Sequence, residues 1–382
     1  MTDALTRPIR VGVVGASVTA GASDWAAHAH IPALHALPDF ELTAVCTSRA
    51  ETSLPSAQRF GAALGFHNVA DLAACDDIDL VTVSLRVPHH RDAVLAALAG
   101  GRAVYCEWPL ATNAAQAAEL TAAAAAAGVP AFVGLQLRSD PVVALAAEAV
   151  ADGTLGAILS AYYEQSAPLQ VECKPSRAWM AQRSAGAHTL SIHGGHALDL
   201  LATVVGDLSD ATARLATRVP VWRTASGTAV TVDAPDTCFI AGSATGGAEV
   251  GVAIRAVPGG SSSWSLTVHG TRGMLRLAAD GPPTVGPNTV ALARNGGALQ
   301  LVEPRPELEF APPELPSGPA RNVARAYGRI GAWWGAALPS SRPALPDFAA
   351  GLAMHRVLEA IEHSATHGVS VSVPAYTALD RA

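Results

Sequence analysis

Three histidines and an aspartate lie close together and carry side chains suited to moving a proton. They are His188, His193, His196 and Asp199. On a helix, His193 and His196 share one face, with Asp199 one turn further on. Imidazole titrates near neutral pH, so a histidine here can act as acid or base on a hydroxyl or carbonyl group. The simpler alternative is that these side chains only cap or pack the helix.

The same four side chains are of types that bind zinc, but their spacing matches no standard zinc signature. The cysteines are odd in number and scattered, with no CxxC pair. They are Cys46, Cys75, Cys106, Cys173 and Cys238. We therefore expect neither a metal site nor a disulfide framework.

Two further side chains are candidates for proton transfer. Lys174 is the one lysine of the chain and precedes a proline in a loop that leads to Trp179. It either folds over a cleft or is an ordinary surface lysine. Tyr162 and Tyr163 follow one another in a strand-like run, so one of them should face the cleft. We count Tyr163 and Lys174, with His193 and His196, as the catalytic candidates.

A glycine turn follows the first apolar run, Ile9–Gly15. In dinucleotide-binding folds such a turn lets the next helix present its N-terminal amides to a pyrophosphate. The full G-x-G-x-x-G pattern is absent, since Ser17 and Ala20 replace its second and third glycines. An ordinary turn is the alternative, but its place ahead of four more strand–helix units favours a cofactor at Gly15 and Ser17.

The end of the second strand indicates which dinucleotide binds. A carboxylate there usually holds the ribose hydroxyls of NAD. Here the sequence offers Thr47, Ser48 and Arg49 instead. Two hydroxyls and a guanidinium suit a 2′-phosphate, so we predict NADP in preference to NAD. The alternative is that Arg49 is a solvated residue at the start of a helix.

Alternating strands and helices must position these residues in the first third of the chain. A parallel sheet covered on both faces is predicted, because the strands are apolar throughout and alternate with helices. The expected strands are Ile9–Gly15, Glu41–Cys46, Leu80–Leu85, Ala103–Cys106 and Ala131–Leu135. The expected helices are Ile31–Ala36, Ser56–Leu64, Arg91–Ala99 and Ala114–Ala127, the last ending before Gly128.

The second part of the chain has several strands in succession and indicates an antiparallel or mixed sheet with a helix on one face. The expected strands are Ala157–Gln165, Ala211–Val221, Asp236–Ala241, Ala248–Ala256, Ser262–Gly270 and Met274–Ala278. The expected helices are His188–Val205 and Pro346–His367, and Gly281–Pro319 is expected to form loops and an edge. We predict an α/β protein with a Rossmann domain over residues 1–138 and an α/β substrate and oligomerisation domain over 139–382.

Composition bounds the class of protein. The chain has 382 residues, of which 50% are hydrophobic and 15% charged, and its net charge is −7. That length suggests two domains, and that charge disfavours a nucleic-acid groove. No run resembles a signal peptide, and no apolar run is long enough for a membrane span. We expect a soluble cytoplasmic protein with no nucleic-acid or membrane partner.

Several segments, in order along the chain, resemble the glucose–fructose oxidoreductase/inositol dehydrogenase/MocA family. Cys106–Leu110 is similar to its E-K-P motif, and His30–Leu34 to the helix after its glycine loop. His90 stands where the family has a histidine after the fourth strand. Other matching segments are Val133–Arg138, Gly186–Asp199 with its H-x-x-D ending, and Val268–Gly273. The resemblance implies a Rossmann domain, a second domain with a large open sheet, NAD(P), and a sugar or polyol substrate.

The chain departs from the family pattern at three places. Trp108 replaces the catalytic lysine of E-K-P, and indole is neither acid nor base near neutral pH. Ile192 replaces an aspartate, and Ser84–Val87 lacks the usual proline. These departures and the long nucleotide loop resemble the branch that contains the galactose-pathway repressor of yeasts, whose task is regulatory.

The resemblance also implies further site residues. The motif glutamate, Glu107, lies near the nicotinamide ribose in the family. Trp108 offers a ring face to stack on nicotinamide or a sugar, and the alternative is that it is a buried core residue. We expect the remaining cofactor contacts from residues at or after the ends of the expected strands Leu80–Leu85 and Ala131–Leu135, namely Leu85, Arg86, His90 and Gln136. We expect the substrate to meet Arg138, Trp179, Arg183, His188 and Asp199.

We therefore predict an NAD(P)-dependent oxidoreductase that moves a hydride between nicotinamide and a secondary alcohol or ketone of a sugar-like metabolite. One alternative is a catalytically silent NAD(P)-binding regulator. Another is a redox-neutral epimerase or lyase that recycles bound cofactor. Because a large open sheet leaves one face to cover, we expect a homodimer or homotetramer.

Overall fold

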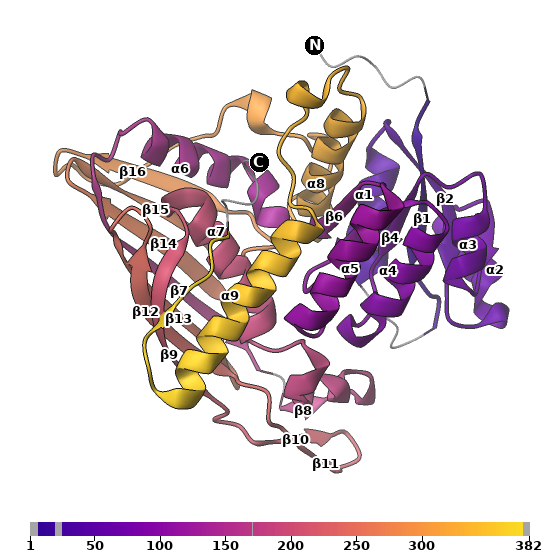
Figure 1. The fold of residues 1–382 in the computed structure, drawn as a ribbon, viewed down its shortest axis with the longest axis horizontal. Coiled ribbons are helices and arrows are strands. Elements are labelled where there is room, and N and C mark those ends of the chain that lie inside the picture. Colours follow the sequence, from indigo (N-terminus) through magenta and orange to yellow (C-terminus); the bar gives the residue numbers. More distant parts are fainter. Residues whose placement is uncertain (1–6, 20–24, 170, 377–382) are drawn as a thin grey trace. The chain divides into compact units, whose positions relative to one another are not determined.

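The computed structural model describes residues 7–19, 25–169 and 171–376, which form two compact units (Figure 1). The first unit contains the chain up to Ser139 together with Phe310–Leu352. The second contains Asp140–Glu309 and the residues from Ala353 onward. The sequence pattern did not indicate that a late segment packs with the first unit.

The first unit is built on a six-stranded parallel sheet with strand order β3-β2-β1-β4-β5-β6. Its strands are β1 (Ile9–Val14), β2 (Phe40–Cys46), β3 (Leu64–Phe66), β4 (Leu80–Val83), β5 (Ala103–Glu107) and β6 (Ala131–Gly134). The predicted parallel sheet is confirmed, with β3 as an additional edge strand. The strand order reverses between β1 and β4, and ligands of such sheets bind at the carboxyl ends of strands beside this point.

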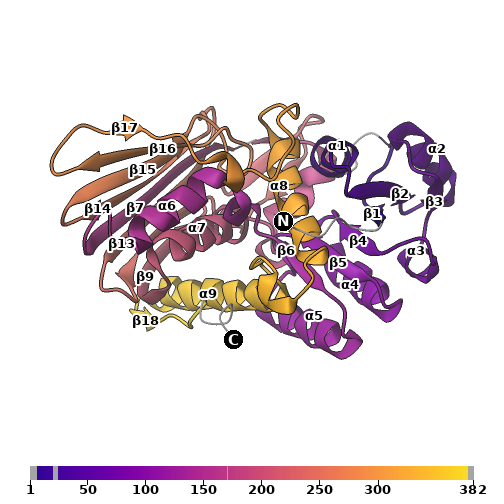
Figure 2. The same ribbon diagram turned by 90° about the horizontal axis from the view of Figure 1, so that it is seen from above.

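Helices cover both faces of this sheet (Figure 2). The bounds are α1 (Ile31–Ala36), α2 (Ala50–Phe60), α3 (Val69–Ala74), α4 (His90–Ala99), α5 (Ala114–Ala127) and α8 (Pro319–Trp334). Helices α1 and α8 lie on one face, and α3, α4 and α5 lie on the other. Helix α5 has the predicted bounds because the Asn113 side chain caps its first turn and Gly128 ends it in the left-handed conformation.

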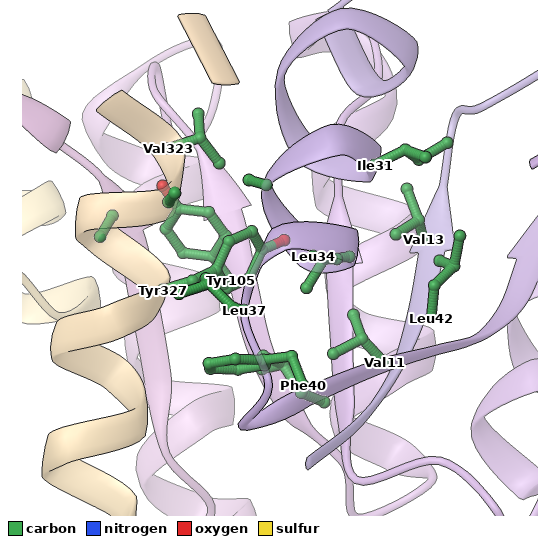
Figure 3. Close-up of a cluster of buried hydrophobic side chains, with 14 of the residues drawn as sticks. Val11, Val13, Ile31, Leu34, Leu37, Phe40, Leu42, Tyr105, Val323 and Tyr327 are labelled. Carbon is green, nitrogen blue, oxygen red and sulfur yellow. The ribbon is translucent and has the colours of Figure 1, made fainter. Parts of the chain in front are cut away.

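The core of the first unit joins the early strands to the late helix α8. Val11 and Val13 of β1 pack with Leu34 of α1 and with Val323 and Tyr327 of α8 (Figure 3). All five are almost fully buried. Burial of a large apolar side chain contributes roughly 1.5–3 kcal/mol, so α8 is an integral part of this unit.

The second unit contains a nine-stranded mixed sheet with strand order β17-β16-β15-β14-β7-β13-β12-β9-β18. It is mixed because β13 and β7 run parallel while the other neighbours run antiparallel. Its strands are β7 (Ile158–Pro168), β9 (Leu208–Ala216), β12 (Thr237–Ala244), β13 (Glu249–Val257), β14 (Ser263–Gly270), β15 (Gly273–Ala279), β16 (Thr289–Arg294), β17 (Gln300–Leu301) and β18 (Val371–Ser372). A small sheet is formed by β8 (Glu172–Cys173), β10 (Val221–Thr224) and β11 (Ala229–Thr231).

One face of the large sheet carries helices and the other is exposed. Helices α6 (Pro141–Ala151) and α7 (Gly195–Val205) and the later part of α9 (Phe348–His367) lie on the same face (Figures 1 and 2). On the opposite face Tyr162 is 64% exposed. The helix expected from His188 begins as a π-helical turn, Leu190–Gly194, and becomes α-helical at Gly195. Within the described residues, no helix combines the length and apolar character that crossing a membrane requires.

Candidate cofactor and substrate sites

Gly15 makes a tight turn at the carboxyl end of β1. Its φ is +113°, which only glycine adopts readily, and its amide donates to the carbonyl oxygen of Cys46. A Cβ on Gly15 would lie 2.1 Å from the carbonyl oxygen of Ser84, at the end of β4. The two strands at the reversal point therefore approach each other so closely that no side chain fits at Gly15.

Arg49 connects the start of α2 with the glycine loop. Its Nη2 donates to Oγ1 of Thr19 at 2.8 Å, and its Nε lies 3.4 Å from Glu51. Its side chain is 51% exposed. Thr47 is buried and its hydroxyl donates to the carbonyl of Arg49, so it shapes this turn. Ser48 is exposed beside it. Sequence reasoning did not single out Glu51, a carboxylate that would suit the ribose hydroxyls of NAD.

His90 is fully buried and joins two loops after neighbouring strands. Nε2 lies 3.0 Å from the carbonyl oxygen of Leu85, and Nδ1 lies 2.9 Å from that of Pro109. Burial lowers the pKa of His90. The ring thus stabilises the backbone near Leu85 and Arg86, which lie in the loop after β4. Arg86 is partly exposed.

Glu107 ends β5 and is surrounded by polar side chains. Nε2 of Gln136 donates to both carboxylate oxygens, at 2.9 Å each. Nε2 of His30 lies 3.0 Å from Oε1 on another side. His30 in turn lies 2.9 Å from the hydroxyl of Tyr327 in α8. The structure thus brings together the predicted Glu107 and Gln136 with two residues that were not predicted as site residues.

Trp108 and Arg138 follow β5 and β6. Trp108 is 6% exposed, so most of its indole is packed. The carbonyl of Arg138 accepts from Nη1 of Arg329 at 2.7 Å. Burial, together with the nearby charge of Arg138, lowers the pKa of Arg329. Two arginines therefore lie close together beside the end of β6.

The second unit contains a cavity of about 310 Å³, a size suited to a small molecule. Its walls come from the ends of β7 and β13, the start of β14, the turn Pro175–Ala181 and the π-helical turn. His188 and His193 line it, and Arg177 and Ser262 do so as well. Much of the remaining lining is apolar, including Met180. Such a cavity accepts a compact molecule with a few polar groups.

His193 is fixed by a hydrogen-bond chain from β7. The hydroxyl of Tyr163 donates to Oε1 of Gln165 at 2.8 Å, so the Gln165 amide nitrogen donates to Nδ1 of His193 at 3.1 Å. Burial lowers the pKa of His193 to about 4. The neutral ring therefore carries its proton on Nε2 and offers a hydrogen-bond donor. Burial also raises the pKa of Tyr163, which suits a hydroxyl that donates without ionising.

His196 lies deeper and has a different environment. Its Nδ1 is buried without a hydrogen-bond partner among the described residues. Burial, with a smaller effect of nearby His193, lowers its pKa to about 3. A histidine that accepts a proton becomes an imidazolium, and burial disfavours that form of His196.

The last two members of the predicted histidine cluster have structural partners. Nδ1 of His188 accepts from the backbone amide of Ser191, and burial lowers its pKa to about 4. Asp199 is fully buried, and the hydroxyl of Tyr376 donates to it at 2.6 Å. The aspartate thus fixes the segment after β18 against α7.

The predicted loop residues are not all brought together. Arg183 pairs with Glu362 of α9 at 3.0 Å. Lys174 is exposed, while its neighbour Cys173 is buried and lines the cavity. Trp179 is partly exposed. Neither Lys174 nor Trp179 is part of the cavity wall.

Many residues of these sites were predicted from the sequence, whereas several of the side chains that form hydrogen bonds with them were not. Gln165 stands two positions after Tyr163 in β7, and residues two apart in a strand point to the same face. The sequence could therefore have indicated Gln165 as a neighbour of Tyr163. Tyr327 gave no such signal, because it meets His30 only through the fold.

Two family models match the chain, one within each of its two structural units. Residues 9–135 match the model of an oxidoreductase family with an NAD-binding Rossmann fold. Residues 141–279 match the model of the Gal80p C-terminal domain. Over residues 9–135 the chain belongs to the Gfo/Idh/MocA oxidoreductase family, and over residues 141–279 it is similar to Gal80p. The predicted resemblance is confirmed.

Relatives of the chain within the family include both enzymes and regulators. Dehydrogenase aclE of Aspergillus oryzae is 33% identical over 210 residues, which is 54% of this chain and 57% of that protein. The regulatory protein GAL80 of Kluyveromyces lactis is 30% identical over 213 residues, which is 53% of this chain and 46% of that protein. The chain therefore matches these curated relatives over about half of their length.

Solved structures show the same fold over nearly the whole chain. A super-repressor mutant of Gal80p from Saccharomyces cerevisiae has a TM-score of 0.83 at 22% identity, covering 98% of this chain and 100% of that one. Levoglucosan dehydrogenase in complex with NADH and levoglucosan has a TM-score of 0.80 at 22% identity, covering 96% and 100%. The predicted fold class, a Rossmann sheet followed by an α/β domain with a large mixed sheet, is confirmed.

Proposed function

We propose that this chain binds a nicotinamide dinucleotide and uses it to transfer a hydride to or from a secondary alcohol or ketone of a small carbohydrate-like molecule. The observation that carries the proposal is the cavity of the second unit, which His188 and His193 line. The first unit of the same chain has a tight glycine turn at Gly15, at the carboxyl end of β1, as in dinucleotide-binding sheets. Membership of an oxidoreductase family with dehydrogenase relatives supports it.

Each unit has a separate task in this proposal. The backbone at Gly15 and Ser17 approaches the pyrophosphate, and Glu107 holds the ribose next to the nicotinamide. The dinucleotide supplies the hydride chemistry. In the second unit, Nε2 of His193 donates to the oxygen of the substrate and fixes its orientation. Of the four residues predicted to transfer the proton, His193, His196, Tyr163 and Lys174, only His193 lines the cavity, so the proposal gives it this role.

The cofactor part of the proposal is tested by titrating the purified chain with NADPH and NADH and following the fluorescence of the reduced nicotinamide. We expect saturable binding of at least one of them. If the chain binds neither NADPH nor NADH, the proposal is contradicted, because the carboxyl edge of the parallel sheet would then bind no dinucleotide.

The proposed preference for NADP depends on Arg49, which reaches from α2 to the glycine loop. We expect Arg49→Ala to weaken NADPH binding about tenfold and to leave NADH binding unchanged, since only NADPH carries the 2′-phosphate. Arg59→Ala is the matched control, because Arg59 is an exposed arginine at the other end of the same helix. Equal losses for both cofactors would count against the 2′-phosphate contact.

A second candidate function is an NAD(P)-binding regulator without turnover. Trp108 favours it, because indole stands where the family resemblance implies a catalytic lysine. The likeness of residues 141–279 to the Gal80p C-terminal domain also favours it. Such a protein would bind NADPH or NADH, oxidise no substrate and co-purify with a protein partner.

A further inference from the structure

Five side chains of the first unit form one continuous polar chain that ends on Glu107. Oγ1 of Thr82 lies 2.8 Å from the hydroxyl of Tyr327, which lies 2.9 Å from Nδ1 of His30. Nε2 of His30 lies 3.0 Å from Oε1 of Glu107, and Gln136 donates to the carboxylate from another side. Thr82, His30 and Tyr327 have no exposed surface, whereas the Glu107 side chain is 12% exposed.

The carboxylate of Glu107 sets the direction of these polar contacts, because its oxygens only accept hydrogen bonds. Neutral His30 therefore carries its proton on Nε2, and its Nδ1 accepts from the hydroxyl of Tyr327. Thr82 in turn donates to Tyr327. The polar chain thus holds the imidazole of His30 against Glu107.

The His30–Glu107 contact is mainly electrostatic. Although the two atoms are 3.0 Å apart, the N–H of His30 does not point straight at the oxygen. The attraction between an N–H dipole and a carboxylate is stronger inside a protein than at its surface, because the effective dielectric constant is lower. Two aromatic rings also pack against His30, Tyr105 at 5.7 Å and Tyr327 at 5.8 Å between ring centroids. The imidazole therefore has a fixed place.

We propose that His30 is the positioning residue for Glu107, and that Tyr327 keeps His30 in place. This rests on the proposed function, in which Glu107 holds the nicotinamide ribose. Tyr327 belongs to α8, so the late segment Phe310–Leu352 contributes to the cofactor site through the core of the first unit (Figure 3). Without His30, the carboxylate keeps only Gln136 and gains freedom to rotate.

Two substitutions of His30 distinguish the contribution of its Nδ1 from that of its Nε2. The amide nitrogen of asparagine takes the place of Nδ1 and loses the Glu107 contact, while that of glutamine takes the place of Nε2 and keeps it. We expect His30→Asn to weaken NADPH binding about tenfold, and His30→Gln to weaken it less than threefold. In a Glu107→Gln background, His30→Asn should have no further effect, because coupled residues are not additive.

The tyrosines provide a matched pair of variants. Tyr327 and Tyr105 are both fully buried beside His30, with ring centroids 5.4 Å apart. The hydroxyl of Tyr327 meets His30 and Thr82, whereas that of Tyr105 lies beside Gln136 and does not meet His30. We expect Tyr327→Phe to weaken NADPH binding at least threefold, and Tyr105→Phe to weaken it less, because Tyr105→Phe leaves both hydrogen-bond contacts of the Tyr327 hydroxyl in place.

The outcomes separate the inference from the function on which it rests. If the wild type binds NADPH and His30→Asn binds it equally well, the positioning role is overturned and the proposed function stands. The same holds if His30→Asn acts with full strength in the Glu107→Gln background. If the wild type binds neither NADPH nor NADH, the proposed function fails and the positioning role fails with it.

Discussion

Gly15→Ala is expected to destabilise the protein by about 3 kcal/mol or more and to remove dinucleotide binding. The new Cβ would lie 2.1 Å from the carbonyl oxygen of Ser84, and φ at this position is +113°. Gly15 and Ser84 directly follow the paired strands β1 and β4, so their backbones cannot move apart without disturbing two central strands. Urea unfolding and NADPH titration measure the two effects.

Gly101→Ala is the matched control for this prediction. Gly101 also has a positive φ, +69°, but a Cβ there meets nothing within 4 Å. The left-handed conformation alone costs an alanine about 1 kcal/mol. If Gly15→Ala costs no more than Gly101→Ala and keeps its NADPH affinity, the close approach of β1 and β4 does not constrain the site.

Mild acid is expected to destabilise the second unit through its buried histidines. Burial lowers the pKa of His188 to about 4 and that of His196 to about 3. An unfolded histidine has a pKa of about 6.5. As the pH falls from about 6.5 to about 4, the unfolded chain therefore binds protons that the folded chain does not. Stability is complete above pH 6.5 and decreases below it.

The expected loss at pH 5 is about 2 kcal/mol for each of these two histidines. His193 should contribute less, because its ring is partly exposed where it lines the cavity. Such a loss is a large part of the stability of an ordinary domain. Urea unfolding at pH 7 and pH 5 measures it.

His196→Gln should flatten the dependence of unfolding free energy on pH, because the variant has no group to protonate. His269→Gln, at an exposed position of β14, is the control and should leave the dependence as it is. An unfolding free energy that is equal at pH 7 and pH 5 in the wild type would contradict the prediction.

Local signals predicted much of the fold. Helix α5 was predicted with its bounds because Gly128 stops it, and the main strands of the first sheet were predicted because each is a continuous apolar run. Strand β3 escaped prediction because it is only 3 residues long. Helix α3 escaped although Asn68, which caps its first turn, is a start signal present in the sequence. Helix α8 escaped because it starts at Pro319, at the end of a segment rich in proline and glycine.

The candidate site was predictable only in part, for a physical reason. Glu107 and Gln136 follow strands, and the ends of parallel strands meet at one edge, so their proximity was expected. The contact of His30 with Tyr327 joins residues far apart in the chain. No local pattern encodes such a pair. The burial that lowers the pKa values of His188, His193 and His196 likewise arises from packing rather than from spacing.

Turnover tests the central claim most directly. The purified chain, supplied with NADP or NAD, is mixed with a panel of sugars, polyols and cyclic diols, and the absorbance of reduced nicotinamide is recorded. We expect at least one compound to reduce the cofactor, and His193→Asn to lower that rate. Tight binding of NADPH or NADH with no redox change on any compound, together with a co-purifying protein partner, would contradict the dehydrogenase and favour the regulator.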